Sequence, residues 1–157
     1  MQKPWPVMLT AYSLGIGGSE RQLCEIAKSL DRRWFEPHVG CFHPEGMRAD
    51  ELRQAGVPLV KFATRSLRSP ATLSAAASVG RYLRQHDIAM VHSFDVPSTI
   101  FAVPVARLYR TPAVLSSQRA YRDLSSGLYR RLLQVTDRLV DGIVVNCQAI
   151  KLHLVEQ

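Results

Sequence analysis

The sequence predicts an α/β domain built on a doubly wound parallel sheet. Six short apolar runs alternate with segments in which apolar residues recur at helical spacing. The apolar runs are nearly continuous, which is typical of parallel strands buried on both faces. A length of 157 residues suits a single domain. Because crossovers between parallel strands are right-handed, we expect a Rossmann-like sheet of six or seven strands in the order 3-2-1-4-5-6.

The first half of the chain predicts three strands and three helices. Leu23 and Leu30 lie on one side of the first helix, and Gly56 follows the second helix as a plausible left-handed C′ residue. Ser69 is expected to cap the third helix, with Pro70 as its first residue. The expected strands are 7–12, 36–43 and 57–62, and the expected helices are 19–30, 47–56 and 70–86.

The second half continues the alternation and ends in a helix that begins near residue 148. Pro104 is expected to kink its helix. In the next helix an apolar stripe combines Leu124, Leu128, Leu132 and Val135. This stripe either packs on the sheet or, with the surrounding arginines, lies on an anionic membrane. The expected strands are 88–94, 112–117 and 142–147, and the expected helices are 98–109 and 124–138.

Composition limits the classes of partner. A net charge of +7 and a pI near 9.8 favour anionic partners, although a basic protein that is merely well solvated would look the same. Cys24, Cys41 and Cys147 lie far apart among apolar neighbours, so we expect reduced and mostly buried thiols and no metal site. Residues 1–8 lack the apolar region of a signal peptide, and no apolar run reaches the roughly 20 residues of a membrane span.

A glycine-rich loop joins the first strand to the first helix in "YSLGIGGSERQL". Gly17 and Gly18 permit tight turning and close approach of the backbone to a ligand. Ser19 is expected to be the N-cap, with Gln22 completing a capping box. The helix N-terminus would then suit a phosphate, although Glu20 competes for it. The spacing fits neither the dinucleotide fingerprint nor a Walker loop, and a loop that only turns the chain is the alternative.

Ligands of doubly wound sheets bind at the carboxyl ends of the strands, and three polar residues are expected there. His92 ends the fourth strand, where it either takes part in chemistry or is satisfied by backbone. Arg119 follows the fifth strand and either clamps a phosphate or pairs with Asp123 on the surface. Asn146 ends the sixth strand and is expected to be structural.

Three segments together resemble a known family. The segment "LGIGGSERQLCEIAKSL" resembles the first loop and helix of retaining GT-B glycosyltransferases of family 4. "IAMVHSFDVPSTIFAVPVARLYRTPAVLSSQR" is similar to that family's fourth strand, small-residue helix and fifth strand. "VDGIVVNCQAIKLHL" resembles its sixth strand and following helix, with cysteine where serine is usual. The resemblance covers essentially the whole chain as residues 1–157 of an N-terminal, acceptor-binding domain.

The resemblance implies roles for individual residues. It makes Gly17 and Gly18 the loop glycines that approach the donor diphosphate, and Arg119 is expected to assist them. His92 matches the first position of a family His-x-His pattern, and Phe94 stands at the second. The catalytic role therefore falls to His92 or Asp95. On the acceptor side the expected residues are Ser19, Glu20 and Phe94.

The implied activity is transfer of a sugar from a nucleotide sugar to an acceptor hydroxyl, with the nucleotide sugar as co-substrate and with no other cofactor or metal. The acceptor would be a glycan or lipid-linked glycan of polysaccharide biosynthesis, and no nucleic acid is expected. The family's C-terminal donor-binding domain has no counterpart in the sequence, so this fragment alone is expected to be inactive. A cytoplasmic location is expected, with peripheral attachment to the inner face of the cytoplasmic membrane as an option that the basic segments favour.

Two other classes stay open from the sequence. A non-catalytic Rossmann-like binding module would explain Phe94 in place of the family histidine. A fragment of a nucleotide-cofactor-binding oxidoreductase would need an acidic residue after the second strand, where Glu45 stands, although its glycine fingerprint is broken. A nucleic-acid binder has only the net charge in its favour, because no basic and aromatic recognition motif is present.

Overall fold

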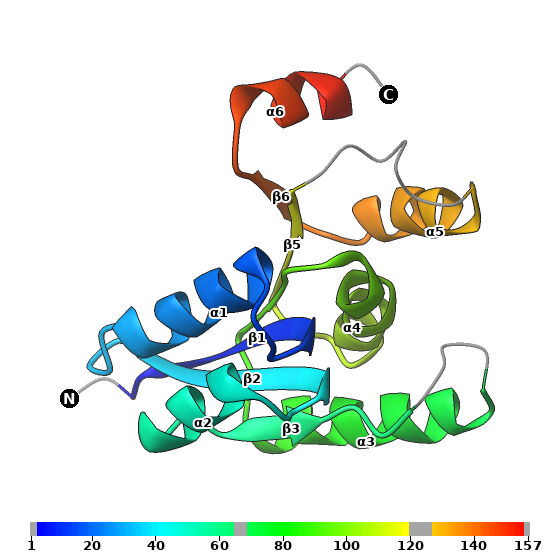
Figure 1. The fold of residues 1–157 in the computed structure, drawn as a ribbon. Coiled ribbons are helices and arrows are strands. Elements are labelled where there is room, and N and C mark those ends of the chain that lie inside the picture. Colours follow the sequence, from blue (N-terminus) through cyan, green and yellow to red (C-terminus); the bar gives the residue numbers. More distant parts are fainter. Residues whose placement is uncertain (1–2, 65–68, 120–126, 156–157) are drawn as a thin grey trace.

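The computed structural model describes residues 3–64, 69–119 and 127–155. Within them, a parallel sheet has the order β3-β2-β1-β4-β5-β6, which confirms the predicted topology (Figure 1). The strands are β1 Trp5–Ser13, β2 Phe35–His43, β3 Leu59–Lys61, β4 Met90–Ser93, β5 Ala113–Gln118 and β6 Gly142–Val145. The helices are α1 Gly18–Ser29, α2 Met47–Gln54, α3 Ala71–Gln85, α4 Val96–Leu108, α5 Gly127–Asp137 and α6 Gln148–Val155.

The central strand β1 divides the core into two layers. Its side chains alternate between the two faces of the sheet, so that Met8 and Leu9 pack in different apolar clusters. Leu9 meets α1 and α2 through residues such as Leu23 and Leu52, whereas Met8 meets α3 and α4 through residues such as Val79. Both faces of β1 are buried, which explains why its sequence is mostly apolar.

Three phenylalanine rings form the centre of the layer beneath α3 and α4. Phe62 lies 5.2 Å from Phe42 and 4.9 Å from Phe101, measured between ring centroids. Gly40 of β2 makes room for this cluster, because a Cβ there would come within 2.5 Å of the Phe62 ring. On the face of the sheet covered by α3 and α4, tightly packed aromatic rings therefore lie against the ends of β2 and β3.

Several helix ends differ from the sequence-based prediction. α4 begins at Val96 because the Asp95 side chain accepts a hydrogen bond from the Ser98 amide at 2.9 Å. α3 begins at Ala71, one residue later than expected, although Ser69 Oγ does accept from the Ala71 amide at 3.2 Å. Gly56 has a φ of +67°, which confirms the left-handed turn expected after α2.

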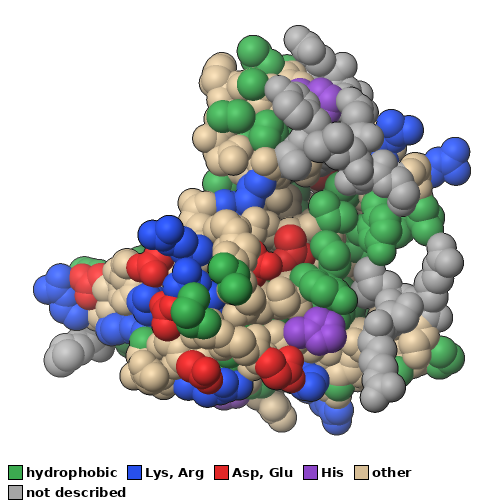
Figure 2. Space-filling model, in the orientation of Figure 1, with side chains coloured by type: hydrophobic (Ala, Val, Ile, Leu, Met, Phe, Trp, Pro, Cys, Tyr) green, Lys and Arg blue, Asp and Glu red, His purple; other side chains and the backbone are tan. Residues whose placement is uncertain are grey.

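α5 exposes the apolar stripe that the sequence analysis identified. Leu128, Leu132 and Val135 are 48%, 36% and 56% exposed, while Leu133 and Thr136 are the buried residues of this helix. The alternative in which these three stripe residues pack on the sheet is therefore wrong. Leu124, the fourth residue of the stripe, lies outside the described residues. Hydrophobic side chains gather where α5 lies (Figure 2).

Two further observations bear on the surface. Cys24 and Cys41 are buried as expected, but Cys147 is exposed, because it follows the outermost strand β6 at the open side of the sheet. In the part of the chain that the structure describes, no helix has both the length and the apolar character needed to cross a bilayer.

Candidate active site

The carboxyl ends of β1, β4 and β5 bring four of the predicted site residues to one edge of the sheet. Parallel registers pair Thr10 with Ser93 and Ser93 with Ser116, so the carboxyl ends of the three strands lie at the same edge of the sheet. The loop with Gly17 and Gly18 leaves this edge after β1, His92 lies in β4, and Arg119 follows β5. The predicted grouping of Gly17, Gly18, His92 and Arg119 is confirmed.

The start of α1 is one or two residues earlier than expected. Gly17 is the N-cap residue, and no side chain caps the helix. The prediction that Ser19 is the N-cap is wrong, because Ser19 already lies in the first turn. The capping box is wrong as well, since the Gln22 side chain is bound to Arg119. Leu14 is fully buried and anchors the loop, whereas Ile16 at its tip is 85% exposed.

The two loop glycines have different surroundings. A Cβ on Gly17 would collide with the carboxylate of Glu20, which folds back over the N-cap and also accepts from Ser13 Oγ at 3.3 Å. A Cβ on Gly18 would meet nothing within 4 Å, and its φ lies outside the left-handed region. No contact within the described protein requires glycine at position 18, so the open space above it can admit a ligand.

Arg119 supplies a positive charge at this edge of the sheet. Its guanidinium lies 4.9 Å from the centroid of the Phe94 ring and donates from Nη1 to the side-chain oxygen of Gln22. Its Nε–H is buried and has no hydrogen-bond partner among the described residues. Burial lowers the pKa of Arg119, yet an arginine stays charged at neutral pH. Asp123, the alternative partner, lies outside the described residues.

Phe94 lies beneath the site. It is 1% exposed, belongs to the core layer under α1 and lies 4.4 Å from the His92 ring, measured between centroids. The expectation that Phe94 faces the acceptor is therefore wrong. Its apolar ring instead supports the guanidinium of Arg119, a contact that a histidine at this position would replace with a second polar group.

His92 is held as a neutral imidazole. Its Nε2 lies 2.9 Å from Ser117 Oγ, in a hydrogen bond whose direction depends on the tautomer. Burial and, second, the nearby charge of Arg119 lower the pKa of His92 to about 4. At pH 7 the imidazole can accept or donate a hydrogen bond, but it carries no positive charge.

Asp95 joins two segments at this edge. One carboxylate oxygen accepts from the Ser98 amide and the other accepts from the Tyr12 amide at 2.5 Å. The side chain thus caps α4 and ties it to the end of β1. Burial raises the pKa of Asp95, while these hydrogen bonds act in the opposite direction. Both oxygens are occupied by backbone amides, which favours a positioning role for this residue.

Sequence reasoning missed three partners in this arrangement. Gln22, Ser117 and Tyr12 each bind a predicted site residue, and each lies 25 or more positions away from it in the chain. For Ser117 a signal was present, because "SSQ" closes an otherwise apolar strand with polar residues that are buried in the fold. Gln22 and Tyr12 carry no comparable signal.

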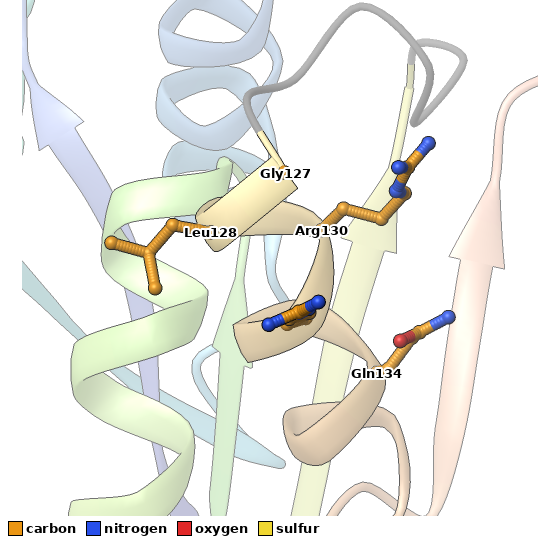
Figure 3. A pocket seen from close by; sticks show the side chains of 5 residues that line it. Gly127, Leu128, Arg130 and Gln134 are labelled. Atoms are coloured by element: carbon orange, nitrogen blue, oxygen red, sulfur yellow. The ribbon is translucent and has the colours of Figure 1, made fainter.

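An open cavity lies beside the first turns of α5. Its volume is about 590 Å³, and Gly127, Leu128, Arg130, Arg131 and Gln134 line it. Arg130 and Gln134 extend from one side of the helix and Leu128 from the opposite side (Figure 3). The cavity is thus lined by both basic and exposed apolar residues of α5, an element that follows β5 and Arg119 in the chain.

Comparison with solved structures identifies the architecture. HepE from Anabaena, crystallised with UDP and glucose, superposes with a TM-score of 0.75 at 19% identity over 96% of this chain and 40% of HepE. MurG from Acinetobacter baumannii gives 0.68 at 19% identity over 90% and 41%. A putative UDP-N-acetylglucosamine 2-epimerase from Listeria monocytogenes gives 0.70 at 14% over 99% and 42%. The chain thus spans about two fifths of the proteins it matches, and a search of curated proteins found no match.

The class of protein follows from the fold and from a match to a family model. The chain is a Rossmann-like α/β domain that matches the N-terminal half of the GT-B fold. Residues 16–157 match the model of Glycosyltransferase Family 4. The chain belongs to glycosyltransferase family 4.

Proposed function

We propose that this chain is the acceptor-binding domain of an enzyme that moves a sugar from a nucleotide sugar to an acceptor hydroxyl. Family membership supports the reaction class, and HepE, a protein of the same fold, was crystallised with UDP and with UDP-glucose. The oxidoreductase alternative has no support from these matches. A non-catalytic binding module is less favoured, because a cation, Arg119, and a neutral imidazole, His92, lie at the same edge of the sheet.

The observation that carries the proposal is the placement of Arg119. Its guanidinium is oriented by Gln22 and Phe94, while its buried Nε–H has no described partner. In the proposed reaction the sugar passes through an oxocarbenium-like transition state while negative charge grows on the leaving diphosphate. A fixed guanidinium stabilises that charge without reorganising, and the backbone N–H groups at the start of α1, where Gly18 lies, are further donors.

His92 then acts as a neutral hydrogen-bonding group toward the transferred sugar. A protonated imidazole would compete with Arg119 for the diphosphate and would repel a positively charged transition state. The low pKa of His92 avoids both effects at neutral pH. Asp95 holds β1 and α4 in place and so positions His92 and the glycine loop. Ser19 and Glu20 complete the acceptor side of the loop in this proposal.

The proposed acceptor is a glycan or a lipid-linked glycan handled at the cytoplasmic surface of a membrane. Support comes from α5, a short helix that carries exposed leucines as well as Arg130 and Arg131. Such a helix can lie in the interface of an anionic bilayer. Polysaccharide biosynthesis would be the setting.

We further propose that the chain needs a donor-binding domain for activity. It spans about two fifths of the length of the solved proteins that it matches. Closure of two domains excludes water and aligns the reactants, which one domain cannot do. The 157-residue chain alone should therefore bind UDP weakly and transfer no sugar.

The test uses the full-length protein, of which this chain is the proposed acceptor-binding domain. UDP binding is measured by calorimetry, and transfer to a panel of glycan acceptors is followed by mass spectrometry, for the wild type and for Arg119→Ala. The matched control is Arg33→Ala, because Arg33 is an exposed arginine that pairs with Asp31 before β2, at the opposite edge. Loss of a fixed cation should lower kcat about 100-fold. Equal activity of both variants and the wild type would contradict the role of Arg119.

A further inference from the structure

A second cavity lies at the same carboxyl edge, on the other side of β1 from His92 and Arg119. It has a volume of about 580 Å³ and is formed at the ends of β2 and β3. The residues that matter for its chemistry are Phe42, His43, Lys61, Phe62 and Ser69. None of the described residues that line it is acidic.

The floor of this cavity is rigid and apolar. Phe42 and Phe62 are 5% and 0% exposed and meet edge to face at 5.2 Å between ring centroids. The Phe62 ring can occupy this position against β2 only because Gly40 has no side chain. A fixed aromatic floor with a few polar groups above it is the usual composition of a site for a small cyclic ligand.

The polar groups above the floor are hydrogen-bond donors. Lys61 carries the only formal positive charge among the described lining residues, and its partner Glu45 lies 3.4 Å away in an exposed ion pair of low strength. Ser69 Oγ accepts from the Ala71 amide and keeps its own O–H for donation. The amides of 71–73 already bond to residues 69 and 70, so side chains rather than the helix end would hold a ligand.

The cavity is connected to the proposed reaction centre through Tyr12. The Tyr12 amide donates to Asp95, and its hydroxyl lies 3.3 Å from His43 Nε2. The Tyr12 ring is 45% exposed and packs against Phe42 at 5.6 Å and against His43 at 5.0 Å between centroids. An extended ligand could therefore follow one continuous strip along the ends of β4, β1, β2 and β3.

We infer that this cavity binds an anionic group on the acceptor glycan, a phosphate or a carboxylate. The inference rests on the proposed function and names the acceptor's chemical class. β4 and β3 are three strand positions apart in the sheet, which corresponds to about 14 Å at 4.8 Å per strand. The charged sugar occupies the cavity above the buried phenylalanine rings, beside Lys61, and the reacting hydroxyl belongs to a different unit of the acceptor near His92.

The test measures binding of simple probes to the full-length protein by NMR titration. The probes are glucose 6-phosphate, glucuronate, uncharged glucose and inorganic phosphate. Lys61→Ala should weaken the better-bound charged sugar about tenfold and leave glucose unaffected, whereas Lys61→Arg should retain most of the affinity. Lys3→Ala is the matched control, because Lys3 is an exposed lysine paired with Asp87 at 3.9 Å near the start of β1. The two charged sugars distinguish a phosphate from a carboxylate.

Three outcomes would overturn the inference: glucose binding as tightly as either charged sugar, inorganic phosphate binding as tightly as glucose 6-phosphate, or displacement of the charged sugar by UDP. UDP binding is measured separately in the same samples. If UDP fails to bind while the charged sugar still depends on Lys61, the anion subsite stands and the proposed transferase function fails. If UDP binds normally and Lys61→Ala changes nothing, the function stands and this inference is wrong.

Discussion

Replacement of Gly18 by alanine separates a structural role of the glycine loop from a ligand-binding role. Gly18 is the first residue of α1, its φ lies outside the left-handed region, and an added Cβ would meet no atom within 4 Å. Alanine is favoured over glycine in helices by up to about 1 kcal/mol, and less in the first turn. We therefore expect Gly18→Ala to leave the free energy of unfolding unchanged or to raise it slightly.

The effect on ligand binding should be opposite. A methyl group above the first turn would push a phosphate away from the backbone N–H groups. A hydrogen bond to a charged group contributes about 1.5 to 3 kcal/mol, so loss of one such bond lowers UDP affinity by about tenfold or more. Gly18→Val, with its bulkier β-branched side chain, should show a larger loss of affinity at a melting temperature close to that of the wild type.

The measurements are thermal melting and UDP calorimetry on the full-length protein. Gly56→Ala serves as the matched control, because Gly56 has a φ of +67° and open space around its Cα. That variant should lower the melting temperature by a few degrees, since left-handed backbone costs a non-glycine residue about 1 to 2 kcal/mol, and it should bind UDP normally. If Gly18→Val binds UDP and transfers sugar as the wild type does, the loop is a turn without a ligand.

Three further predictions concern stability and surface. The pKa of His92 is about 4 in the folded chain against 6.5 in the unfolded chain, so His92 contributes up to about 3 kcal/mol to the free energy of unfolding above pH 6.5, and this contribution is lost as the pH falls toward 4. In urea unfolding, the free energy of unfolding of His92→Gln should therefore fall less between pH 6.5 and pH 4 than that of the wild type, and an equal fall in both proteins would contradict the role of His92. Gly80→Ala should cost about 1 to 3 kcal/mol, because its Cβ would collide with the Tyr109 ring, and Tyr109→Ala in the same chain should relieve part of that cost. The protein should co-sediment with anionic vesicles, and the bound fraction should fall as the salt concentration rises. Leu132→Asp should abolish this binding, because Leu132 is an exposed apolar residue of α5, and equal co-sedimentation with neutral vesicles would exclude the membrane role.

The topology of the sheet could be predicted because it depends on patterns spread over many residues. Six apolar runs separated by helical segments allow few arrangements once crossovers are right-handed, and the observed strand order is the simplest of them. The same rule placed Gly18, His92 and Arg119 at one edge without any knowledge of their side-chain contacts.

Individual side-chain roles at the site were less predictable, because partners distant in sequence decide them. Gln22 fits a capping box locally, yet Arg119, 97 positions away, binds its side chain. Asp95 follows a strand where a catalytic carboxylate could stand, but the Tyr12 amide, 83 positions away, occupies one of its oxygens. Phe94 stands where the family resemblance implies a histidine, and its contact with a guanidinium comes from Arg119, which follows β5 and lies 25 positions away in the chain.

The distribution of the cysteines makes the domain convenient for spectroscopy. Cys24 and Cys41 are buried, and burial raises the pKa of both thiols, that of Cys41 to about 12. Cys147 is exposed and follows β6 at the carboxyl edge, the same edge that carries Arg119. A maleimide dye reacts with accessible thiolate, so under native conditions it should label Cys147 alone. In the 157-residue chain a single fluorophore there would report, without any mutation, on ligands that approach this edge of the sheet.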